Sequence, residues 1–574
     1  MFERPREIIV ARTVGEVLPA LERIEEACTR EQRFAAGFLS YEAAPAFDTA
    51  LPTQAPDDFP LLWFGLYDRA DECTLETLAA AAGDRGDEVD ERWEPSISFD
   101  QYARTFGSLQ ELIRNGDTYQ VNYTYRVRTT LHSDPYALFL QLASAQTPPF
   151  GAYINTGDWA ICSASPELFF HRAGERVESR PMKGTAARGL WFEQDLENAR
   201  RLRESEKEQS ENIMIVDMVR NDLGRVARPG SVRVTNLFEV ERYPTVLQLT
   251  STVVADTPAS LVGVMRALFP AASITGAPKA RTMEIIAEVE CSPRRIYTGT
   301  IGFIEPGGRS QFSVAIRTVL VNLATRRAEY GIGGGIVADS HLADEWNESQ
   351  IKARALTSRQ PAFDLLETLV WLPEAGYVLI GRHMKRLMQS ADYFGFHVDV
   401  LDVRDRLEQH ARELPRMPHR IRMTVPRSGQ VTISSKPHDI AAGFGEIAIA
   451  ASPIDPGNPF LYHKTTNRAV YEQAVAARPG FDDVLLYNDK GEVTESTIAN
   501  LVVERGGVLL TPPVSCGLLP GTLRGHLLGE GKIREEVLTL QDVAEASACY
   551  LVNSVRGFHP VSVAYKSVSS CPTA

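Results

Sequence analysis

The sequence predicts a two-part protein, in which a layered α/β body is followed by a smaller domain of the α/β or α+β class. The chain has 574 residues, which is too long for a single hydrophobic core, and its 44% hydrophobic and 23% charged residues are typical of a globular protein. Helix-like runs at 137–144 and 212–221 alternate irregularly with strand-like runs at 160–174 and 310–322. This irregular alternation favours a layered body over a parallel doubly wound sheet.

Two stretches mark the expected boundaries. The acidic, apolar-poor stretch 84–95 indicates a surface linker, and at 356–362 a proline follows the end of a charged helix-like run. Two apolar strand-like runs around a turn, over 363–380, then indicate the start of a new domain. We therefore divide the chain into an N-terminal part, a main body and a C-terminal domain, at 1–90, 91–357 and 361–574.

Composition narrows the class of protein. A net charge of −14 argues against a nucleic-acid partner, and no apolar run is long enough to cross a bilayer. The N-terminus lacks the apolar core of a secretory signal. The seven cysteines are scattered and form no CxxC pair, which argues against a zinc site or a disulfide framework. A reducing cytoplasm fits this number and spacing of cysteines best.

Two pairs of glutamates have helical spacing. Glu208 and Glu211 are three residues apart, as are Glu345 and Glu348, so each pair lies on one face of a helix. Lys352 is one turn beyond Glu348 and shares its face. Each pair alone fits a solvated helix surface. Two pairs brought together would suit Mg²⁺, which prefers oxygen ligands.

Six runs in the main body carry a family resemblance. They are SPELFF (165–170), RPMKGTAARG (180–189), IVDMVRNDLGRV (215–226), SITGAPKARTMEII (273–286), YTGTIGF (297–303) and GIGGGIVADS (331–340). In this order they closely resemble the chorismate-utilising enzymes, which include component I of anthranilate synthase and of aminodeoxychorismate synthase, and the isochorismate synthases. The resemblance covers about 95–357 and implies a layered α/β sandwich around a buried cleft.

The resemblance implies a metal site and a proton donor. Glu211 and Glu348 would bind Mg²⁺ with Glu208 and Glu345 close by, and the metal would hold the ring carboxylate of chorismate. Glu167 would lie beside the departing 4-hydroxyl. A carboxylic acid there can protonate this leaving group if burial raises its pKa.

The resemblance also implies a set of groups that contact the substrate carboxylates. These are Tyr297, Arg317, Lys352 and the backbone amides near Gly333 and Gly334.

Lys183 separates the members of this family. Anthranilate synthases usually have alanine at the matching position, whereas aminodeoxychorismate synthases have lysine. A neutral lysine amine can add to C2 of the ring and expel the C4 hydroxyl, after which ammonia adds at C4 and expels the lysine. The alternative is that Lys183 acts only as an electrostatic clamp on an anionic substrate.

A second set of motifs follows residue 361. It comprises RHMKRLMQSADYFGF (382–396), YHKTTNR (462–468), DDVLLYNDKGEVTESTIANLVV (482–503) and CGLLPGTLRGHLL (516–528). In this order the motifs resemble the fold-type IV pyridoxal-phosphate enzymes, among them branched-chain aminotransferase and aminodeoxychorismate lyase. The match covers about 363–560.

This second resemblance implies a cofactor site. Lys464 would hold pyridoxal 5′-phosphate covalently, and Glu495 would face its pyridine nitrogen. The phosphate would be bound by Arg386, the backbone amides of Thr522 and Leu523, and Ser554.

Two further positions bear on the reaction of the C-terminal domain. Thr368 matches a lyase position near the proton that is removed. Val370 lies where several transaminases have a nearby arginine, which counts against an amino-acid transaminase.

Together the resemblances imply a bifunctional enzyme of folate biosynthesis. It would convert chorismate and ammonia to 4-amino-4-deoxychorismate and then eliminate pyruvate to give 4-aminobenzoate. No cysteine lies in an amidotransferase motif, so ammonia would come from a separate glutamine amidotransferase subunit or from solution. Two alternatives remain: an anthranilate synthase component I fused to an amino-acid transaminase, and a synthase with a catalytically idle C-terminal scaffold.

Overall fold

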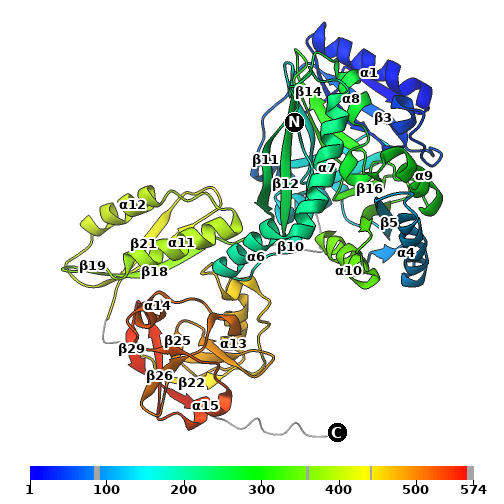
Figure 1. Cartoon of the computed structure of the whole chain (residues 1–574). Coiled ribbons are helices and arrows are strands. Elements are labelled where there is room, and N and C mark those ends of the chain that lie inside the picture. The colour runs from blue at the N-terminus through cyan, green and yellow to red at the C-terminus, as the bar shows by residue number, and fades with distance from the viewer. Residues whose placement is uncertain (83–90, 357–360, 440–442, 565–574) are drawn as a thin grey trace. The chain divides into compact units, whose positions relative to one another are not determined.

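The computed structural model describes residues 1–82, 91–356, 361–439 and 443–564 (Figure 1). Two compact units make up the chain. Unit 1 comprises 1–188 and 198–360, and unit 2 comprises 189–197 and 361–574. Part of the predicted linker at 84–95, part of the predicted junction at 356–362 and the last residues of the chain lie outside the described residues.

The first sheet of unit 1 joins the N-terminal segment to the main body. Its strands follow the order β1 (Glu7–Ala11), β3 (Leu62–Tyr67), β2 (Phe34–Leu39), β14 (Thr300–Ile304), β15 (Ser310–Val314), β8 (Leu168–Ala173), β9 (Arg176–Arg180), β12 (Val246–Asp256) and β10 (Met182–Ala187), with β11 (Arg233–Arg242) beside β12. β2 pairs with β14 in antiparallel register, with Leu39 opposite Thr300. The N-terminal part therefore completes the sheet of the main body.

The second sheet of unit 1 is built around one long antiparallel pair. Its order is β13 (Gly276–Ala277), β5 (Gln120–Thr130), β17 (Arg327–Val337), β16 (Thr318–Asn322), β7 (Trp159–Ser165) and β6 (Phe150–Asn155), with β4 (Glu94–Pro95) beside β5. β5 and β17 stay in register along their whole length, from Gln120 opposite Val337 to Thr130 opposite Arg327.

The two sheets of unit 1 pack face to face between helices. Phe38 and Trp63 of the first sheet share a core with Trp159 and Ile161 of the second. The outer face of the first sheet carries α1 (Val14–Thr29), α2 (Ala44–Phe47), α7 (Glu206–Gly224) and α8 (Leu261–Leu268). That of the second carries α4 (Phe99–Arg114), α5 (Pro135–Gln146), α9 (Lys279–Val289) and α10 (Leu342–Ala353). The layered sandwich predicted from the sequence is thus confirmed, and α7 runs beside β12 (Figure 1).

Unit 2 contains two sheets, each with its own core. The first has the order β19 (Gly376–Tyr377), β18 (Leu365–Leu372), β20 (His419–Val425) and β21 (Thr432–Pro437), and α11 (Ile380–Phe394) and α12 (Val400–Arg412) pack on it. The second has the order β27 (Arg534–Glu535), β26 (Val508–Thr511), β25 (Asn500–Arg505), β24 (Val493–Ser496), β23 (Asp483–Tyr487), β22 (Glu446–Ile449) and β30 (Ser562–Ala564). β28 (Ala548–Asn553) pairs with β25 and with β29 (Gly557–Pro560), and α13 (Ala469–Ala476), α14 (Thr522–Gly529) and α15 (Leu540–Glu545) complete the unit. The strand–turn–strand predicted at 363–380 is the β18–β19 hairpin.

Two predicted strand runs are each broken in the middle. The run at 160–174 ends as β7 at Ser165 and resumes as β8, and the run at 310–322 is divided into β15 and β16. The breaks leave Glu167 and Arg317 between strands, where their side chains are free of the strict alternation of a sheet.

Among the described residues, no helix is both long and apolar enough to cross a membrane. The described cysteines are all free thiols.

Candidate active sites

The four predicted glutamates of unit 1 lie near the N-terminal ends of two helices. Ser205 caps α7 and accepts a hydrogen bond from the backbone N–H of Glu208. Glu345 lies in the first turn of α10. Carboxylates in a first turn are favoured by the helix dipole. Glycines pack against them, because a Cβ on Gly184 would lie 3.0 Å from Oε2 of Glu208, and one on Gly334 would lie 2.9 Å from Oε2 of Glu345.

Lys183 lies between the two carboxylate pairs. Its Nζ is 3.1 Å from Oε2 of Glu211, and its charge also acts on Glu208, Glu345 and Glu348. Burial raises the pKa of Glu208 and of Glu345. Lys183 therefore lies within a cluster of four glutamates.

The second lysine of the site is paired in the same way. Nζ of Lys352 lies 2.8 Å from Oε1 of Glu348 and lowers the pKa of that carboxyl. The same Nζ donates to the carbonyl of Gly333 at 2.8 Å. The predicted face shared by Glu348 and Lys352 is confirmed.

In the part of the chain that the structure describes, no three His, Cys, Asp or Glu side chains are already grouped as a metal site. The two carboxylates expected as ligands are each paired with a lysine: Glu211 contacts Lys183 and Glu348 contacts Lys352. The four carboxylates remain a suitable oxygen donor set for Mg²⁺ if these ammonium groups move aside. The metal site stays a prediction.

Glu167 is buried in the break between β7 and β8. The hydroxyl of Ser273 donates to its Oε1 at 2.5 Å. Burial raises the pKa of Glu167 to about 7, although the Ser273 hydrogen bond opposes that rise. Near neutral pH the side chain can therefore hold a proton that it can give away.

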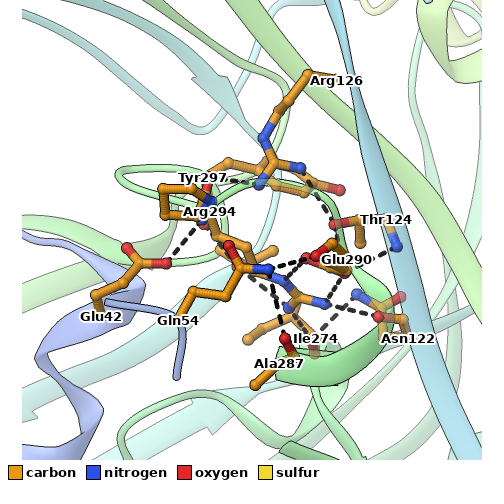
Figure 2. Close-up of polar contacts among 12 residues, drawn as sticks. Glu42, Gln54, Asn122, Thr124, Arg126, Ile274, Ala287, Glu290, Arg294 and Tyr297 are labelled. Carbon is orange, nitrogen blue, oxygen red and sulfur yellow. Dashed lines mark hydrogen bonds and ion pairs between the residues drawn. The ribbon is translucent and has the colours of Figure 1, made fainter. Parts of the chain in front are cut away.

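Tyr297 is held between a glycine and a cation. A Cβ on Gly331 would come within 2.2 Å of the Tyr297 ring. Arg126, which lies opposite Gly331 on β5, places its guanidinium 5.1 Å from the centre of the same ring (Figure 2). Only glycine at position 331 leaves room for this ring.

Arg317 lies in the break between β15 and β16 with a positive φ of 49°. Its guanidinium stacks on the ring of Tyr243 at 5.4 Å, and burial lowers its pKa. Within the described ranges the Arg317 guanidinium makes no hydrogen bond or ion pair. A mostly buried cation without a partner calls for an anion, so this position suits a substrate carboxylate.

The glycine run around Gly333 and Gly334 lies at a half-open strand edge. β16 pairs with β17 only as far as Tyr330, and beyond it the described partner of β17 is β5. The other edge of the glycine run therefore has backbone groups that are free of a strand partner. Contact between these amides and a ligand stays a prediction.

In unit 2 most of the predicted residues line one cavity of about 220 Å³. They are Thr368, Arg386, Lys464, Glu495, Thr522 and Ser554. Two named positions lie apart: Val370 is buried in β18, and the side chain of Leu523 packs in a small apolar cluster. Only the backbone amide of Leu523 is left for the predicted contact at the start of α14.

The two central groups of this cavity have shifted pKa values. Burial, followed by the charge of Arg386, lowers the pKa of Lys464 to about 8. Burial raises the pKa of Glu495 to about 7. Tyr471 and Asn500 donate to the two oxygens of Glu495 at 2.9 and 3.0 Å, which fixes the carboxyl toward the cavity.

The sequence analysis missed a buried carboxylate beside the predicted phosphate ligands. Arg386 donates twice to Glu367, at 2.8 and 2.6 Å, and Nδ1 of His383 is 2.7 Å from the same carboxylate. Nε2 of His383 then faces the hydroxyls of Ser554 at 3.0 Å and Thr522 at 3.3 Å. Burial raises the pKa of Glu367, but Arg386 and His383 outweigh it and hold that pKa at about 2. The sequence signal that could have revealed Glu367 is a glutamate at an inward-facing position of β18, which is mostly apolar.

Four arginines on the cavity wall were also missed. Arg420 and Arg422 alternate with buried residues on β20, so both face the cavity, and Arg468 and Arg556 line it as well. The cavity is therefore strongly basic within an acidic protein, and it suits a ligand with several negative charges.

Comparison with known proteins follows the two units. The family of chorismate binding enzymes matches residues 6–358, and the family of class IV amino-transferases matches residues 364–564. The chain is 44% identical over 260 residues to aminodeoxychorismate synthase component 1 of Klebsiella aerogenes, which covers 45% of this chain and 57% of that protein. It is 38% identical over 280 residues to anthranilate synthase component 1 of Streptomyces coelicolor, which covers 48% of this chain and 54% of that protein. The chain thus spans just over half the length of these curated relatives.

A solved structure supports the fold of unit 1. Anthranilate synthase component I from Streptococcus pneumoniae aligns with a TM-score of 0.53 at 24% identity, over 62% of this chain and 91% of that chain. This likeness concerns the fold alone.

The layered unit with its cluster of glutamates, followed by a unit with a buried lysine in a basic cavity, has the architecture of the chorismate-utilising class joined to a class IV amino-transferase fold. The chain belongs to the chorismate binding enzyme family, and it carries a class IV amino-transferase domain at its C-terminal end. Both family predictions made from the motifs are confirmed. The class IV domain implies pyridoxal phosphate as the cofactor of unit 2.

The raised pKa of Glu167 predicts a dependence of stability on pH. A carboxyl with a folded pKa of about 7, against an ordinary 4.5, holds its proton more tightly when folded. It therefore leaves stability unchanged below pH 4.5 and lowers it as the pH rises to 7. Glu167→Gln stays neutral, so between pH 4.5 and 8 its free energy of unfolding should rise relative to wild type by about 3 kcal/mol.

Urea unfolding at the two pH values measures this difference. Glu3→Gln, at an exposed position, is the matched control and should follow the wild type. If the free energies of unfolding of Glu167→Gln and wild type change equally between the two pH values, Glu167 titrates normally.

Proposed function

We propose that the chain makes 4-aminobenzoate from chorismate in two steps. Unit 1 replaces the 4-hydroxyl of chorismate by an amino group, and unit 2 removes pyruvate from the resulting 4-amino-4-deoxychorismate. The similarity to aminodeoxychorismate synthase component 1 supports the first step. The observation that carries the proposal is the place of Lys183, whose amine lies within the cluster of four glutamates, 3.1 Å from Glu211.

Lys183 and Glu167 divide the amination between them. Glu211 accepts the proton that the Lys183 amine must lose, and the neutral amine adds to C2 of the ring. Both ring double bonds shift by one position, the C4–O bond breaks, and Glu167 gives its proton to the departing hydroxyl, which leaves as water. Ammonia then adds at C4 and loses a proton, both double bonds shift back, and Lys183 leaves C2 as an amine that takes up a proton.

The anionic substrate is bound by separated cationic and polar groups. Arg317, Tyr297 and Lys352, with the backbone amides of Gly333 and Gly334, hold the carboxylates of chorismate. The Arg317 guanidinium supports this assignment, because among the described residues it stacks on Tyr243 but makes no hydrogen bond or ion pair. Glu208, Glu211, Glu345 and Glu348 would hold Mg²⁺, which would neutralise the ring carboxylate.

Ammonia for the first step comes from a separate glutamine amidotransferase subunit. The support is the similarity to a protein named aminodeoxychorismate synthase component 1, a name that implies a second component. Ammonium in solution replaces that subunit in the tests below.

Unit 2 holds pyridoxal phosphate through the residues that line its cavity. Lys464 would hold it covalently, Glu495 would face its ring nitrogen, and Arg386 would bind its phosphate with Thr522, Leu523 and Ser554. When bound, the cofactor would supply an electron sink for breaking the C4–H bond. Lys464, whose pKa is lowered to about 8, would take the C4 proton once its amine is released, with Thr368 beside it, and pyruvate would leave as the ring becomes aromatic. Arg420 and Arg422 face the two carboxylates of the substrate.

Two other functions make different products. An anthranilate synthase fused to a transaminase would release 2-aminobenzoate and pyruvate without any use of Lys183. A synthase with an idle C-terminal domain would accumulate 4-amino-4-deoxychorismate. Supplying chorismate, ammonium, Mg²⁺ and pyridoxal phosphate and identifying the product by mass and retention time separates the three.

Lys183 should form a covalent adduct when ammonia is withheld. Because the second half of the amination then cannot occur, intact-protein mass spectrometry should show the mass of chorismate less one water on the wild type. Lys183→Ala should show no adduct, and the exposed neighbour control Lys207→Ala should behave as wild type. A wild type without the adduct, under conditions that trap it, would favour the electrostatic clamp.

The first step should depend on Mg²⁺ through the glutamate pairs. Glu348→Gln removes one charge from the donor set, so it should raise the Mg²⁺ concentration needed for half-maximal rate and lower the rate about a hundred-fold at fixed metal. Glu206→Gln, at an exposed position on α7, should leave both unchanged. Full amination activity of the wild type in excess chelator would rule out the metal.

The two half-reactions should separate by mutation. Lys464→Ala should consume chorismate and ammonium, accumulate 4-amino-4-deoxychorismate and lose the absorbance of bound cofactor. Lys183→Ala should keep that absorbance and convert added 4-amino-4-deoxychorismate. Mixing the two variants should restore 4-aminobenzoate, because the sites act as separate catalytic groups.

Lys490→Ala, at an exposed turn, is the control for the loss of a lysine in unit 2. If Lys464→Ala alone makes 4-aminobenzoate at the wild-type rate, the lyase assignment is wrong.

A further inference from the structure

A buried ion pair lies behind the proposed chorismate site. Glu290 directly follows α9 and Arg294 lies four residues later in the segment after the helix, and their side chains are 3% and 1% exposed. NH2 of Arg294 is 2.6 Å from Oε1 of Glu290, and its Nε is 3.0 Å from Oε2. The pair and its neighbours, Glu42, Gln54, Asn122, Thr124, Arg126, Ile274, Ala287 and Tyr297, form the Arg294 cluster (Figure 2).

Every N–H group of the Arg294 guanidinium is used. Besides its two bonds to Glu290, it donates to the carbonyls of Ile274 at 2.8 Å and Asn122 at 2.7 Å. The fifth N–H reaches the hydroxyl of Thr298 at 3.4 Å. A lysine has three donors on one atom and cannot make these contacts in several directions. The geometry is therefore specific to arginine.

The contact of Arg294 with Ile274 fixes Ser273, the hydrogen-bond partner of the proposed proton donor Glu167. Ile274 ends the short helix η2 (Ala272–Ile274), and its neighbour Ser273 donates to Glu167 at 2.5 Å. The side chain of Asn122 also donates to the Ile274 carbonyl, at 3.1 Å. Arg294 thus holds the backbone that aims Ser273 at Glu167.

The contact of Arg294 with Thr298 fixes Tyr297. The backbone N–H of Tyr297 donates to the carbonyl of Arg294 at 3.0 Å, and the hydroxyl of Thr298 donates to the carbonyl of Tyr297 at 2.6 Å. Because Arg294 also donates to that hydroxyl, the turn that carries the Tyr297 ring is closed on the guanidinium.

The Glu290 carboxylate fixes β5, the strand that pairs with the glycine run of β17. Oε1 of Glu290 accepts from the backbone N–H and the hydroxyl of Thr124, at 3.0 and 2.8 Å. Thr124 lies opposite Gly333 in the β5–β17 pair, and Asn122 lies opposite Gly335.

The N-terminal segment holds the same turn from outside. Glu42 accepts from the backbone N–H groups of Arg294 and Arg295, at 2.7 and 2.8 Å. The side chain of Gln54 donates to the carbonyls of Ala287 and Glu290. The backbone that carries Arg294 is therefore fixed independently of its side chain.

We propose that Arg294 is a positioning residue of the amination site, which sets Glu167, through Ser273, and Tyr297 in their working geometry. The inference rests on the proposed function of unit 1. It goes beyond that function because Arg294 itself lies behind the substrate-binding groups and matches none of the residues expected from the motifs.

The role of Arg294 leaves a signature in the pH profile. The Ser273 hydrogen bond favours the charged form of Glu167. If Arg294 no longer holds the backbone at 273–274, this bond weakens and the pKa of Glu167 rises. Since Glu167 must carry a proton to act, the alkaline limb of the amination rate then moves to higher pH.

The experiment compares Arg294→Lys, Ser273→Ala and the double variant in the full chain, with chorismate, ammonium and Mg²⁺. Arg294→Lys should lower kcat/KM by about ten-fold or more and raise the KM for chorismate, because Tyr297 loosens. Both single variants should move the alkaline limb upward. The double variant should move it no further than Ser273→Ala alone, because Ser273→Ala already removes the one hydrogen bond through which both changes act.

Arg295→Lys is the matched control. Arg295 is the next residue, and its guanidinium faces outward to Asp57 and Glu329. The kinetics of the Arg295→Lys enzyme should equal those of the wild type. An Arg294→Lys enzyme with unchanged KM and an unshifted limb, and with kcat lowered only in proportion to its folded fraction, would overturn the proposal. Additive shifts in the double variant would overturn it as well.

Two further measurements keep the test decisive. If Arg294→Lys does not fold, Thr298→Val removes its contact to the Tyr297 turn and should raise the KM for chorismate; an unchanged KM would overturn the proposal. The pKa of Glu167 is also measurable without substrate, from the pH dependence of unfolding with and without Glu167→Gln. A wild type that fails to aminate chorismate refutes the proposed function, whereas an unshifted Glu167 in the Arg294→Lys background refutes the positioning role.

Discussion

The pairing of β5 with β17 is the constraint on which unit 1 depends. It joins residues 120–130 to residues 327–337, about two hundred positions later, and carries the glycine run into the cleft. The pair requires glycine for steric reasons, because a Cβ on Gly333 would lie 2.2 Å from the carbonyl oxygen of Tyr123, and one on Gly335 would lie 2.6 Å from Nζ of Lys183. Backbone packing and catalytic geometry thus depend on the same missing side chains.

Desolvation is the second physical theme, and it acts on both units. The protein is acidic overall, yet each site combines a buried carboxyl whose pKa is raised to about 7 with cationic side chains. In unit 1 the cations are Lys183 and Arg317, and in unit 2 they are Lys464 and Arg386. A buried group keeps a charge only when a partner offsets the cost of leaving water: Glu211 offsets that cost for Lys183 and Glu367 for Arg386, whereas Arg317 is left for a ligand anion.

The order of the motifs was enough to predict both families and the layered fold, because many separate residues had to agree. Helical spacing also predicted that Lys352 meets Glu348. Sequence periodicity could not predict that the strand runs break at Glu167 and Arg317, since such breaks follow from the packing of two sheets. Glu367 was missed because a single inward glutamate has no local signature without its partners on α11. The Arg294 cluster gathers residues from five distant segments, which no spacing rule connects. The metal site was predicted from two carboxylate pairs and from the family resemblance, and it stays a prediction. Helical spacing could place Lys352 beside Glu348, but it could not place Lys183 against Glu211, because these two residues lie on different elements.

The Glu367 carboxylate has a consequence for the life of the chain before its cofactor arrives. Since Glu367 already pairs with Arg386 and contacts His383, the basic pocket of unit 2 carries its own internal counterion. An empty pocket therefore leaves the buried Arg386 guanidinium with a partner, which lowers the electrostatic cost of folding before a ligand binds.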